Sequence, residues 1–243
     1  SLAKGETILK NCAIEPEIKD LINFLRKMGC NIKWTGKRTL KIIGAKNLKN
    51  VNYKVMFDRI EAGTYLIAGA ITQGNIKLKG IDAKFLRTEL EILKKIGAKI
   101  TLEKKHIKII GNKIIKNLNL KTAPYPGFPT DLQAQIMVLM CKAKKNSIIK
   151  EQIFENRFMH VAELKRMGAK INIKGNKAFI NGNTIFKGAE LMATDLRASV
   201  SLIIAALTAK EKTIINRIYH LDRGYEKIEN KLKKIGVKIK RLK

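Results

Sequence analysis

Leu25-Arg26-Lys27-Met28-Gly29-Cys30-Asn31-Ile32 is the first of four copies of one short phrase in this chain. Its pattern, Leu-[Lys/Arg]-[Lys/Arg]-[Met/Ile]-Gly-x-x-Ile, returns at Leu93–Ile100, Leu164–Ile171 and Leu232–Ile239. The steps between successive copies are 68, 71 and 68 residues. A nearly constant period of this length is typical of folds built from duplicated supersecondary units. The sequence therefore predicts one structural unit repeated along the chain.

The segment from Asp58 to about Asp131 contains one unit that can be followed in full. Its elements are predicted as helix, strand, helix, strand and strand, at residues 58–71, 76–79, 86–96, 99–102 and 106–110. The first helix is apolar almost all round and rich in small residues, which indicates burial on several sides. The second helix carries an apolar stripe at steps of three and four residues, and Gly97 is its predicted C-cap.

The other units follow the same order. Their elements are predicted at 130–141, 147–149, 158–167 and 170–180 for one, and at 194–207, 213–218, 225–235 and 237–239 for the last. Lys4–Leu9 matches Lys210–Ile215, so the front of the chain corresponds to a unit entered at the end of its first helix. We expect an α/β protein with repeated four-stranded mixed sheets around an apolar helical core, and a chain that is the C-terminal part of a longer protein.

The net charge of +30 comes from 50 Lys and Arg residues against 20 Asp and Glu residues. Such an excess is typical of a polyanion partner, so a basic nucleic-acid-binding module is one alternative. The basic residues are nearly all Lys, with ten Arg, and they are scattered without a basic tail or block. This distribution favours compositional bias on solvated faces over a nucleic-acid surface. The apolar runs are too short for a membrane span.

Neither cysteine nor histidine shows the spacing of a metal site. Cys12, Cys30 and Cys141 lie in or near apolar stretches and are predicted to be small buried thiols in a reducing cytoplasm. The three His residues are far apart in sequence. We therefore predict no metal and no cofactor.

Four Arg residues stand beside acidic phrases at the predicted helix starts, namely Arg59, Arg157, Arg197 and Arg223. An acid at a helix start is ordinarily a cap, because it faces the positive end of the helix dipole. An Arg at the same place opposes that dipole and needs another partner. Either these Arg residues pair with the neighbouring acids, or they surround an anion such as a phosphate or a carboxylate.

A proline-rich loop leads to Asp131. Pro124, Pro126 and Pro129 are three of the four prolines in the chain. Proline fixes the backbone and so fixes the approach to the helix that follows. The loop is interpreted either as a device that aims one carboxylate or as a stiff connection between two units.

Five longer phrases stand in a fixed order along the chain: Asp58–Thr64, Pro126–Gln135, Ile153–His160, Ala193–Ser199 and Arg217–Glu226. Together they closely resemble the bacterial UDP-N-acetylglucosamine 1-carboxyvinyltransferases, a family of enolpyruvyl transferases. The resemblance runs from about Gly5 to Arg241. Phe57 stands where the family usually has Pro, a departure of little consequence.

The resemblance implies a fold of two similar domains, each made of three βαβαββ units in an inside-out α/β barrel, that close over a cleft. Residues 1–57 would be the end of the first domain and residues 58–243 most of the second. The family transfers the enolpyruvyl group of phosphoenolpyruvate to the 3′-hydroxyl of UDP-N-acetylglucosamine through a tetrahedral ketal. This is the first committed step of peptidoglycan synthesis, and it implies a cytoplasmic, monomeric enzyme that needs no nucleic acid or membrane.

By the same resemblance, Asp131 is the carboxylate on the sugar hydroxyl and the candidate general base, supported by Asp195. The other assigned residues are Arg197 and Arg223 for phosphoenolpyruvate, Ile153 and Phe154 for the UDP-sugar, and Arg157 and Arg59 as supports of the cleft. A carboxylate at a helix N-terminus tends towards a low pKa. We therefore expect Asp131 to position the hydroxyl more than to deprotonate it.

Two parts of the family pattern are expected upstream of Ser1: a mobile loop with a proton-donating Cys and a phosphate-binding Lys. None of the three cysteines matches that loop, so this chain alone is not expected to turn over. An enolpyruvyl transferase acting on shikimate 3-phosphate has the same fold and is a second alternative. The Phe154–His160 phrase argues against it.

Overall fold

The computed structural model describes residues 1–242, which form two compact units. The smaller one comprises residues 1–58 together with 124–126, and the larger one comprises the rest of the described chain. The predicted division of a whole enzyme into domains at residue 57 is a separate matter and stays a prediction.

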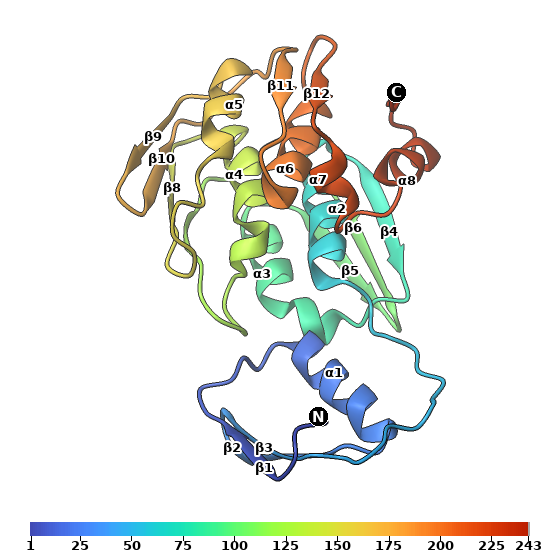
Figure 1. Cartoon of the computed structure of the whole chain (residues 1–243). Coiled ribbons are helices and arrows are strands. Elements are labelled where there is room, and N and C mark those ends of the chain that lie inside the picture. The colour runs from blue at the N-terminus through green and yellow to red at the C-terminus, as the bar shows by residue number, and fades with distance from the viewer. Residues whose placement is uncertain (243) are drawn as a thin grey trace. The chain divides into compact units, whose positions relative to one another are not determined.

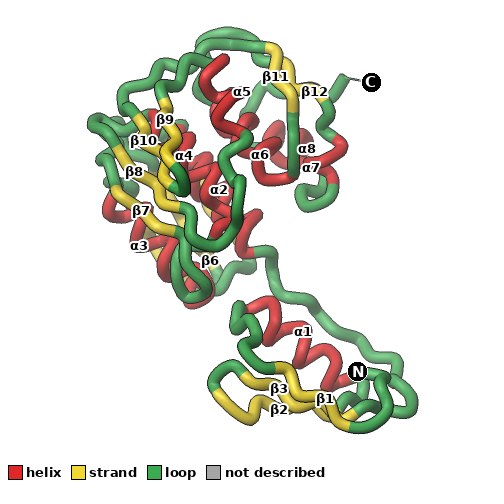
Figure 2. Tube along the Cα trace, turned by 60° about the vertical axis from the view of Figure 1, so that its left-hand side comes forward, coloured by secondary structure: helices red, strands yellow, loops and turns green. Residues whose placement is uncertain are grey.

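The smaller unit is a three-stranded antiparallel sheet with one helix (Figure 2). Its elements are β1 (Glu6–Leu9), α1 (Pro16–Lys27), β2 (Asn31–Gly36) and β3 (Thr39–Ile43), and β3 is the central strand. Ile22 of α1 packs with Ile32 and Leu40 of the sheet, and Cys30 completes this small core. Burial of these apolar side chains is what holds so short a sheet together.

The larger unit contains the remaining elements, shown from cyan to red in Figure 1. The first group is α2 (Arg59–Ile71), β4 (Asn75–Lys79), the 3₁₀ turn η1 (Ala83–Leu86), α3 (Arg87–Lys95), β5 (Lys99–Glu103) and β6 (His106–Ile110). The second is β7 (Asn119–Lys121), η2 (Thr130–Leu132), α4 (Gln133–Cys141), β8 (Ser147–Lys150), α5 (His160–Arg166), β9 (Ile171–Lys174) and β10 (Lys177–Ile180). The third is β11 (Glu190–Met192), α6 (Leu196–Ala206), β12 (Ile214–Asn216), α7 (Tyr219–Asp222) and α8 (Ile228–Lys234).

The second group is a complete βαβαββ unit. Its sheet has the order β7-β8-β10-β9, in which β7 and β8 are parallel and the other pairs are antiparallel. The sheet β4-β6-β5 has three strands, and β11 pairs only with β12. Repeated four-stranded sheets were predicted, with the closing strand of the last unit missing, and within the described residues of the larger unit one sheet has four strands. Within the described residues, no strand of the larger unit precedes α2, and residues 237–239 form none.

The first helices of the three groups, α2, α4 and α6, pack against one another in the centre of the larger unit (Figure 1). Every residue of α4 is buried, and nearly all of α2 and α6 is buried too. Helices that are apolar all round can pack in this way because no face must meet water. This three-helix core was predicted from their composition.

The repeated phrase forms the same helix end in all four copies. Its Gly lies at positive φ, between +95° and +108°, in Gly29, Gly97, Gly168 and Gly236. The next residue donates its N–H to the carbonyl of the phrase's Leu, as Ala98 does to Leu93 at 3.0 Å. This is the Schellman arrangement, which requires a left-handed residue and so selects Gly. A strand follows in the first three copies, but no partner strand follows residues 237–239 within the described chain, and no strand forms there.

Two predicted helix starts were wrong. The second helix of the middle group begins at His160, after a turn in which Asn156 lies at φ +53°. In the last group, Asp222 ends α7 instead of starting a helix, and α8 begins only at Ile228. The interruption has a packing cause: Gly224 lies against the Leu196 side chain and Tyr225 is fully buried, so the chain turns inward between the two helices.

Candidate active site

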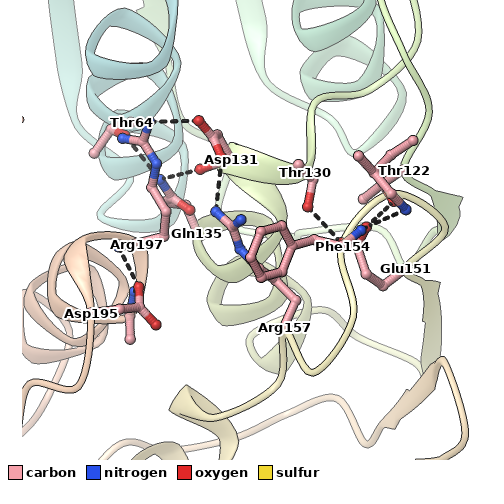
Figure 3. A network of polar contacts seen from close by, with 12 residues as sticks. Thr64, Thr122, Thr130, Asp131, Gln135, Glu151, Phe154, Arg157, Asp195 and Arg197 are labelled. Atoms are coloured by element: carbon pink, nitrogen blue, oxygen red, sulfur yellow. Dashed lines mark hydrogen bonds and ion pairs between the residues drawn. The ribbon is translucent and has the colours of Figure 1, made fainter.

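Asp131 lies between two guanidinium groups (Figure 3). Arg157 donates from Nη2 to Oδ1 at 2.8 Å, and Arg197 donates from Nη2 to Oδ2 at 2.6 Å. The Asp131 side chain is 36% exposed, whereas those of Arg157 and Arg197 are 15% and 17% exposed. The three residues come from η2, the turn before α5 and the first turn of α6, so the fold brings together groups that are up to 66 residues apart.

The position of Asp131 is set by close packing beneath the η2 turn. Leu132 is fully buried. A Cβ built on Gly63 would lie only 2.5 Å from the nearer methyl carbon of Leu132. A side chain at position 63 would clash with Leu132, which would have to shift within a close-packed interior. On its N-terminal side, the η2 turn is directly preceded by Pro129. The close contact of Gly63 with Leu132 therefore holds the η2 turn, and with it Asp131, against α2.

A buried polar cluster holds the backbone of Asp131. Gln135 donates from Nε2 to the Asp131 carbonyl at 3.0 Å and to Thr64 Oγ1 at 3.3 Å. The Thr64 and Tyr225 hydroxyls share a hydrogen bond of 2.9 Å. Sequence reasoning assigned no role to these three residues, although all lie in the five ordered phrases. For Thr64 and Gln135 the available signal was a polar residue in a largely apolar helix, whereas Tyr225 lies in a polar stretch that gave no such signal.

Asp195 is the N-cap of α6, as predicted for an acid at a helix start. Its Oδ1 accepts the backbone N–H groups of Arg197 and Ala198 at 2.7 and 2.9 Å. The cap orders the first helical turn, and Arg197 extends from that turn to Asp131. Asp195 thus orders the turn from which Arg197 reaches Asp131.

Arg157 is held on a second side by an aromatic ring. Its guanidinium carbon lies 4.7 Å from the centre of the Phe154 ring, and Figure 3 shows the ring lying against the guanidinium. Phe154 is 57% exposed and Ile153 is 45% exposed, so both assigned UDP-sugar residues present apolar surface to solvent. Stacking on the ring and pairing with Asp131 fix the plane of the guanidinium.

The loop that carries Ile153 and Phe154 is anchored by Glu151. Glu151 Oε1 accepts the backbone N–H groups of Ile153 and Phe154 at 2.9 and 3.1 Å. The same oxygen accepts from the Thr122 hydroxyl, while Oε2 accepts from the Thr130 hydroxyl. Sequence reasoning did not single out Glu151, whose position directly after a strand was the available signal.

The electrostatics keep Asp131 ionised. Burial alone would raise the pKa of Asp131, but the charges and hydrogen bonds of Arg197 and then Arg157 outweigh it, so its pKa lies below the ordinary value. His160, buried nearby, has a pKa lowered to about 4, chiefly by burial, with Asp195 opposing and Arg157 adding to the shift. The local environment therefore favours an anionic Asp131 and a neutral His160 at pH 7.

The other two assigned Arg residues lie elsewhere. Arg59 is buried and pairs with Glu89 at 3.2 Å, joining the starts of α2 and α3. Arg223 follows α7, is exposed, and has no ion pair within the described part of the chain. Three of the four Arg residues thus pair with acids that are distant in sequence.

Residues 1–242 place no group of three His, Cys, Asp or Glu side chains where it could hold a metal ion. Cys30 and Cys141 are buried as predicted, and Cys12 is half-buried. No helix among these residues is long and apolar enough to cross a bilayer.

Repeated α/β units, one of them a complete βαβαββ unit, and a carboxylate held by two Arg residues define the class as an enolpyruvyl-transferase-like α/β protein. The family model described as EPSP synthase (3-phosphoshikimate 1-carboxyvinyltransferase) matches residues 1–232. The chain belongs to this family, which confirms the predicted fold class.

Curated relatives agree on one name. The UDP-N-acetylglucosamine 1-carboxyvinyltransferase of Pelagibacter ubique (strain HTCC1062) is 72% identical over 241 residues, which are 99% of this chain and 58% of that protein. UDP-N-acetylglucosamine 1-carboxyvinyltransferase 1 of Caldanaerobacter subterraneus subsp. tengcongensis is 52% identical over 239 residues, again 58% of that protein. The chain therefore spans little more than half the length of the curated relatives it matches.

Solved structures give the same fold. The enolpyruvyl transferase NikO from Streptomyces tendae superposes with a TM-score of 0.87 at 26% identity, over 98% of this chain and 57% of that one. EPSP synthase from Acinetobacter baumannii superposes with a TM-score of 0.76 at 21% identity, over 99% of this chain and 59% of that one. The second likeness concerns the fold alone.

Proposed function

We propose that this chain contributes Asp131 and the residues around it to the active site of an enolpyruvyl transferase. The enzyme would use phosphoenolpyruvate and the 3′-hydroxyl of UDP-N-acetylglucosamine. One observation carries the proposal: an ionised carboxylate is fixed between Arg157 and Arg197 on a buried scaffold. The 72% identity to a relative named for this reaction supports the choice of acceptor.

In the proposed reaction, the acceptor oxygen adds to C2 of phosphoenolpyruvate while a proton is delivered to C3. The resulting tetrahedral ketal then expels inorganic phosphate as C3 loses a proton, which restores the double bond. Both steps need charge to be balanced around the carboxylate and the phosphate of the substrate. Arg197 and Arg223 are proposed to bind those anionic groups.

Asp131 is proposed to accept the hydrogen bond of the sugar hydroxyl and to hold its oxygen in line with C2. Its lowered pKa makes it a weak base in the ground state. Proton transfer to Asp131 therefore becomes favourable only as the C–O bond forms and the hydroxyl becomes acidic. Orientation, more than deprotonation, is its proposed contribution.

Ile153 and Phe154 are proposed to border the UDP-sugar. Their N–H groups are taken by Glu151, so a backbone contact at Ile153 would use its carbonyl oxygen. That carbonyl suits a donor, such as the N–H of an N-acetyl group. The exposed side chains of the two residues offer apolar surface beside it.

The alternative acceptor is shikimate 3-phosphate, because the matching family model is described by that reaction. The two curated relatives named above are both UDP-N-acetylglucosamine enzymes at 52% identity or more. They favour the UDP-sugar. The wider parts of the proposal follow from that choice: a monomeric cytoplasmic enzyme whose product enters peptidoglycan synthesis, and with it cell-wall growth and division.

The test is a fusion of this chain to the part of the Pelagibacter ubique enzyme that it does not match, joined in the order of that enzyme. Phosphate release from phosphoenolpyruvate is measured with each acceptor, and the complete Pelagibacter ubique enzyme is the matched positive control. We expect release with UDP-N-acetylglucosamine only. Release with shikimate 3-phosphate alone, or none from a folded fusion while the control is active, would refute the proposal.

A further inference from the structure

Glu151 connects the two loops that carry the proposed acceptor site. We propose that it is a positioning residue, which holds the Ile153–Phe154 loop and the Thr130–Asp131 turn in one fixed relation; this rests on the function proposed above. The residue lies directly after β8 and is 3% exposed. Its carboxylate contacts both segments, and Figure 3 shows it between them.

One carboxylate oxygen organises the Ile153–Phe154 loop. Oε1 accepts two consecutive backbone N–H groups, two and three residues ahead in the chain, at 2.9 and 3.1 Å. These residues belong to no helix or strand, so the regular structure does not bind their N–H groups. Without Glu151 the two donors would have to find water, and the loop would lose its defined course.

The other oxygen holds the turn before Asp131. Oε2 accepts from the Thr130 hydroxyl at 2.9 Å, and Thr130 is the first residue of the η2 turn. Thr122 completes the arrangement, since its hydroxyl donates to Oε1 at 2.6 Å and accepts from the Gln152 N–H at 2.9 Å. A shift of the carboxylate would therefore move both segments together.

The chemistry of the contacts explains why an acid is placed here. The four donors to Glu151 are two hydroxyls and two backbone N–H groups, all of them uncharged. Three of them meet at one oxygen, and the N–H groups cannot reverse their roles, so an acceptor must stand at that point. Hydrogen bonds to an ionised acceptor are also shorter and stronger than neutral ones.

The first experiment measures amide hydrogen exchange on the full chain in Glu151→Ala, Glu151→Gln and Ile149→Ala. Ile149 is fully buried in β8, so Ile149→Ala controls for loss of stability in the same strand. In Glu151→Ala we expect the amides of Ile153 and Phe154 to exchange about tenfold faster or more, beyond the change in Ile149→Ala. Gln keeps an acceptor at the Oε1 position and should restore the rates to within about threefold.

The second experiment uses the fusion enzyme and separates KM from kcat. Glu151→Ala should raise the KM for UDP-N-acetylglucosamine and lower kcat, each by about tenfold, because both the sugar loop and Asp131 lose their fixed positions. Thr130→Val removes only the link to the turn. It should lower kcat several-fold with the KM changed by less than about twofold.

The outcomes separate the two proposals. Equal exchange rates at Ile153 and Phe154 in Glu151→Ala and Ile149→Ala would overturn the positioning role, whatever the enzyme does. The same holds if Glu151→Ala lowers only the amount of folded fusion enzyme and leaves both constants unchanged. An inactive wild-type fusion would instead overturn the proposed function, and the exchange experiment would still decide the role of Glu151. If Glu151→Ala does not fold, Glu151→Gln and Thr130→Val carry the test.

Discussion

Two Arg–carboxylate arrangements in the larger unit use the same groups in opposite surroundings. Arg59 and Glu89 are 4% and 5% exposed in their side chains and join two helices. Asp131, by contrast, is 36% exposed and contacts two Arg residues on separate elements. A buried pair cannot exchange its partner for a ligand without leaving a charge in an apolar interior. A partly exposed triad can, so exposure separates the structural pair from the candidate site.

The largest expected effect tests the buried side of this comparison. Arg59→Met should lower the free energy of unfolding of the chain by about 3–5 kcal/mol, because Glu89 keeps its buried charge without this partner. The double variant Arg59→Met/Glu89→Leu should recover much of the lost free energy of unfolding, since the buried carboxylate is then removed as well. Urea unfolding monitored by circular dichroism measures both. Lys41→Met is the control: its pair with Glu6 is about 40% exposed and should contribute about 1 kcal/mol or less. Unfolding of Arg59→Met at the wild-type urea midpoint would contradict the assignment.

Arg59 also shows where sequence reasoning fails. A local phrase, Asp58-Arg59, indicated an Arg that needs a partner, and this was sound. The partner, Glu89, is 30 residues away, and only the packing of α2 on α3 brings it there. The helix start predicted at Arg223 was wrong for a related reason, because Tyr225 is buried there and α8 begins only at Ile228.

Features with a local cause were predicted well. The Gly of the repeated phrase determines a helix end by itself, and the all-apolar helices could only be central. The cap at Asp195 also followed from neighbouring residues, whereas the role of Asp131 rests on the family resemblance and stays a prediction. Glu151 could not be found in this way, since its four donors come from three separate segments. Which Arg residues bind phosphoenolpyruvate stays a prediction.

The second prediction concerns His160, the buried neutral group near the triad. Its pKa is about 4 in the folded chain against an ordinary 6.5, so the unfolded chain takes up the proton first as the pH falls. The contribution of His160 to the free energy of unfolding is fully present above pH 6.5 and should fall by about 3 kcal/mol between pH 6.5 and pH 4. His160→Met should remove this slope, whereas Leu164→Ala, in the same helix, should lower stability equally at every pH. Urea midpoints between pH 7 and 4 measure the slope, and an unchanged slope in His160→Met would exclude His160 as its source.

The third prediction tests the exposed triad in the fusion enzyme. Arg197→Lys should keep the fold but lower kcat/KM for phosphoenolpyruvate by a factor that corresponds to about 1.5–3 kcal/mol of lost transition-state stabilisation. The reason is that Lys cannot present the planar fork of a guanidinium. Arg223→Lys should lower kcat/KM for phosphoenolpyruvate by a similar factor. Steady-state kinetics measure both, with Arg166→Lys as the matched control on an exposed Arg of α5. Wild-type constants in both variants would show that neither Arg acts on the substrate.

The smallest effect decides whether Asp131 is held as an anion. Its folded pKa lies below the ordinary 3.8, so its pairing stabilises the chain above that pH and is lost as the pH falls through the folded value. Asp131→Asn should therefore lower stability at pH 7, by about 1 kcal/mol or less since the group is partly exposed. The difference between wild type and variant should shrink as the pH falls below 3.8, and it should be smaller at all pH values when Arg157 and Arg197 are both Met. Urea unfolding at pH 7, 4 and 2 measures it. A difference that instead reverses above pH 4, with Asp131→Asn the more stable, would mean that burial outweighs the two guanidinium groups. Asp131 would then have the raised pKa of a general base, and the proposed division between orientation and proton transfer would be wrong.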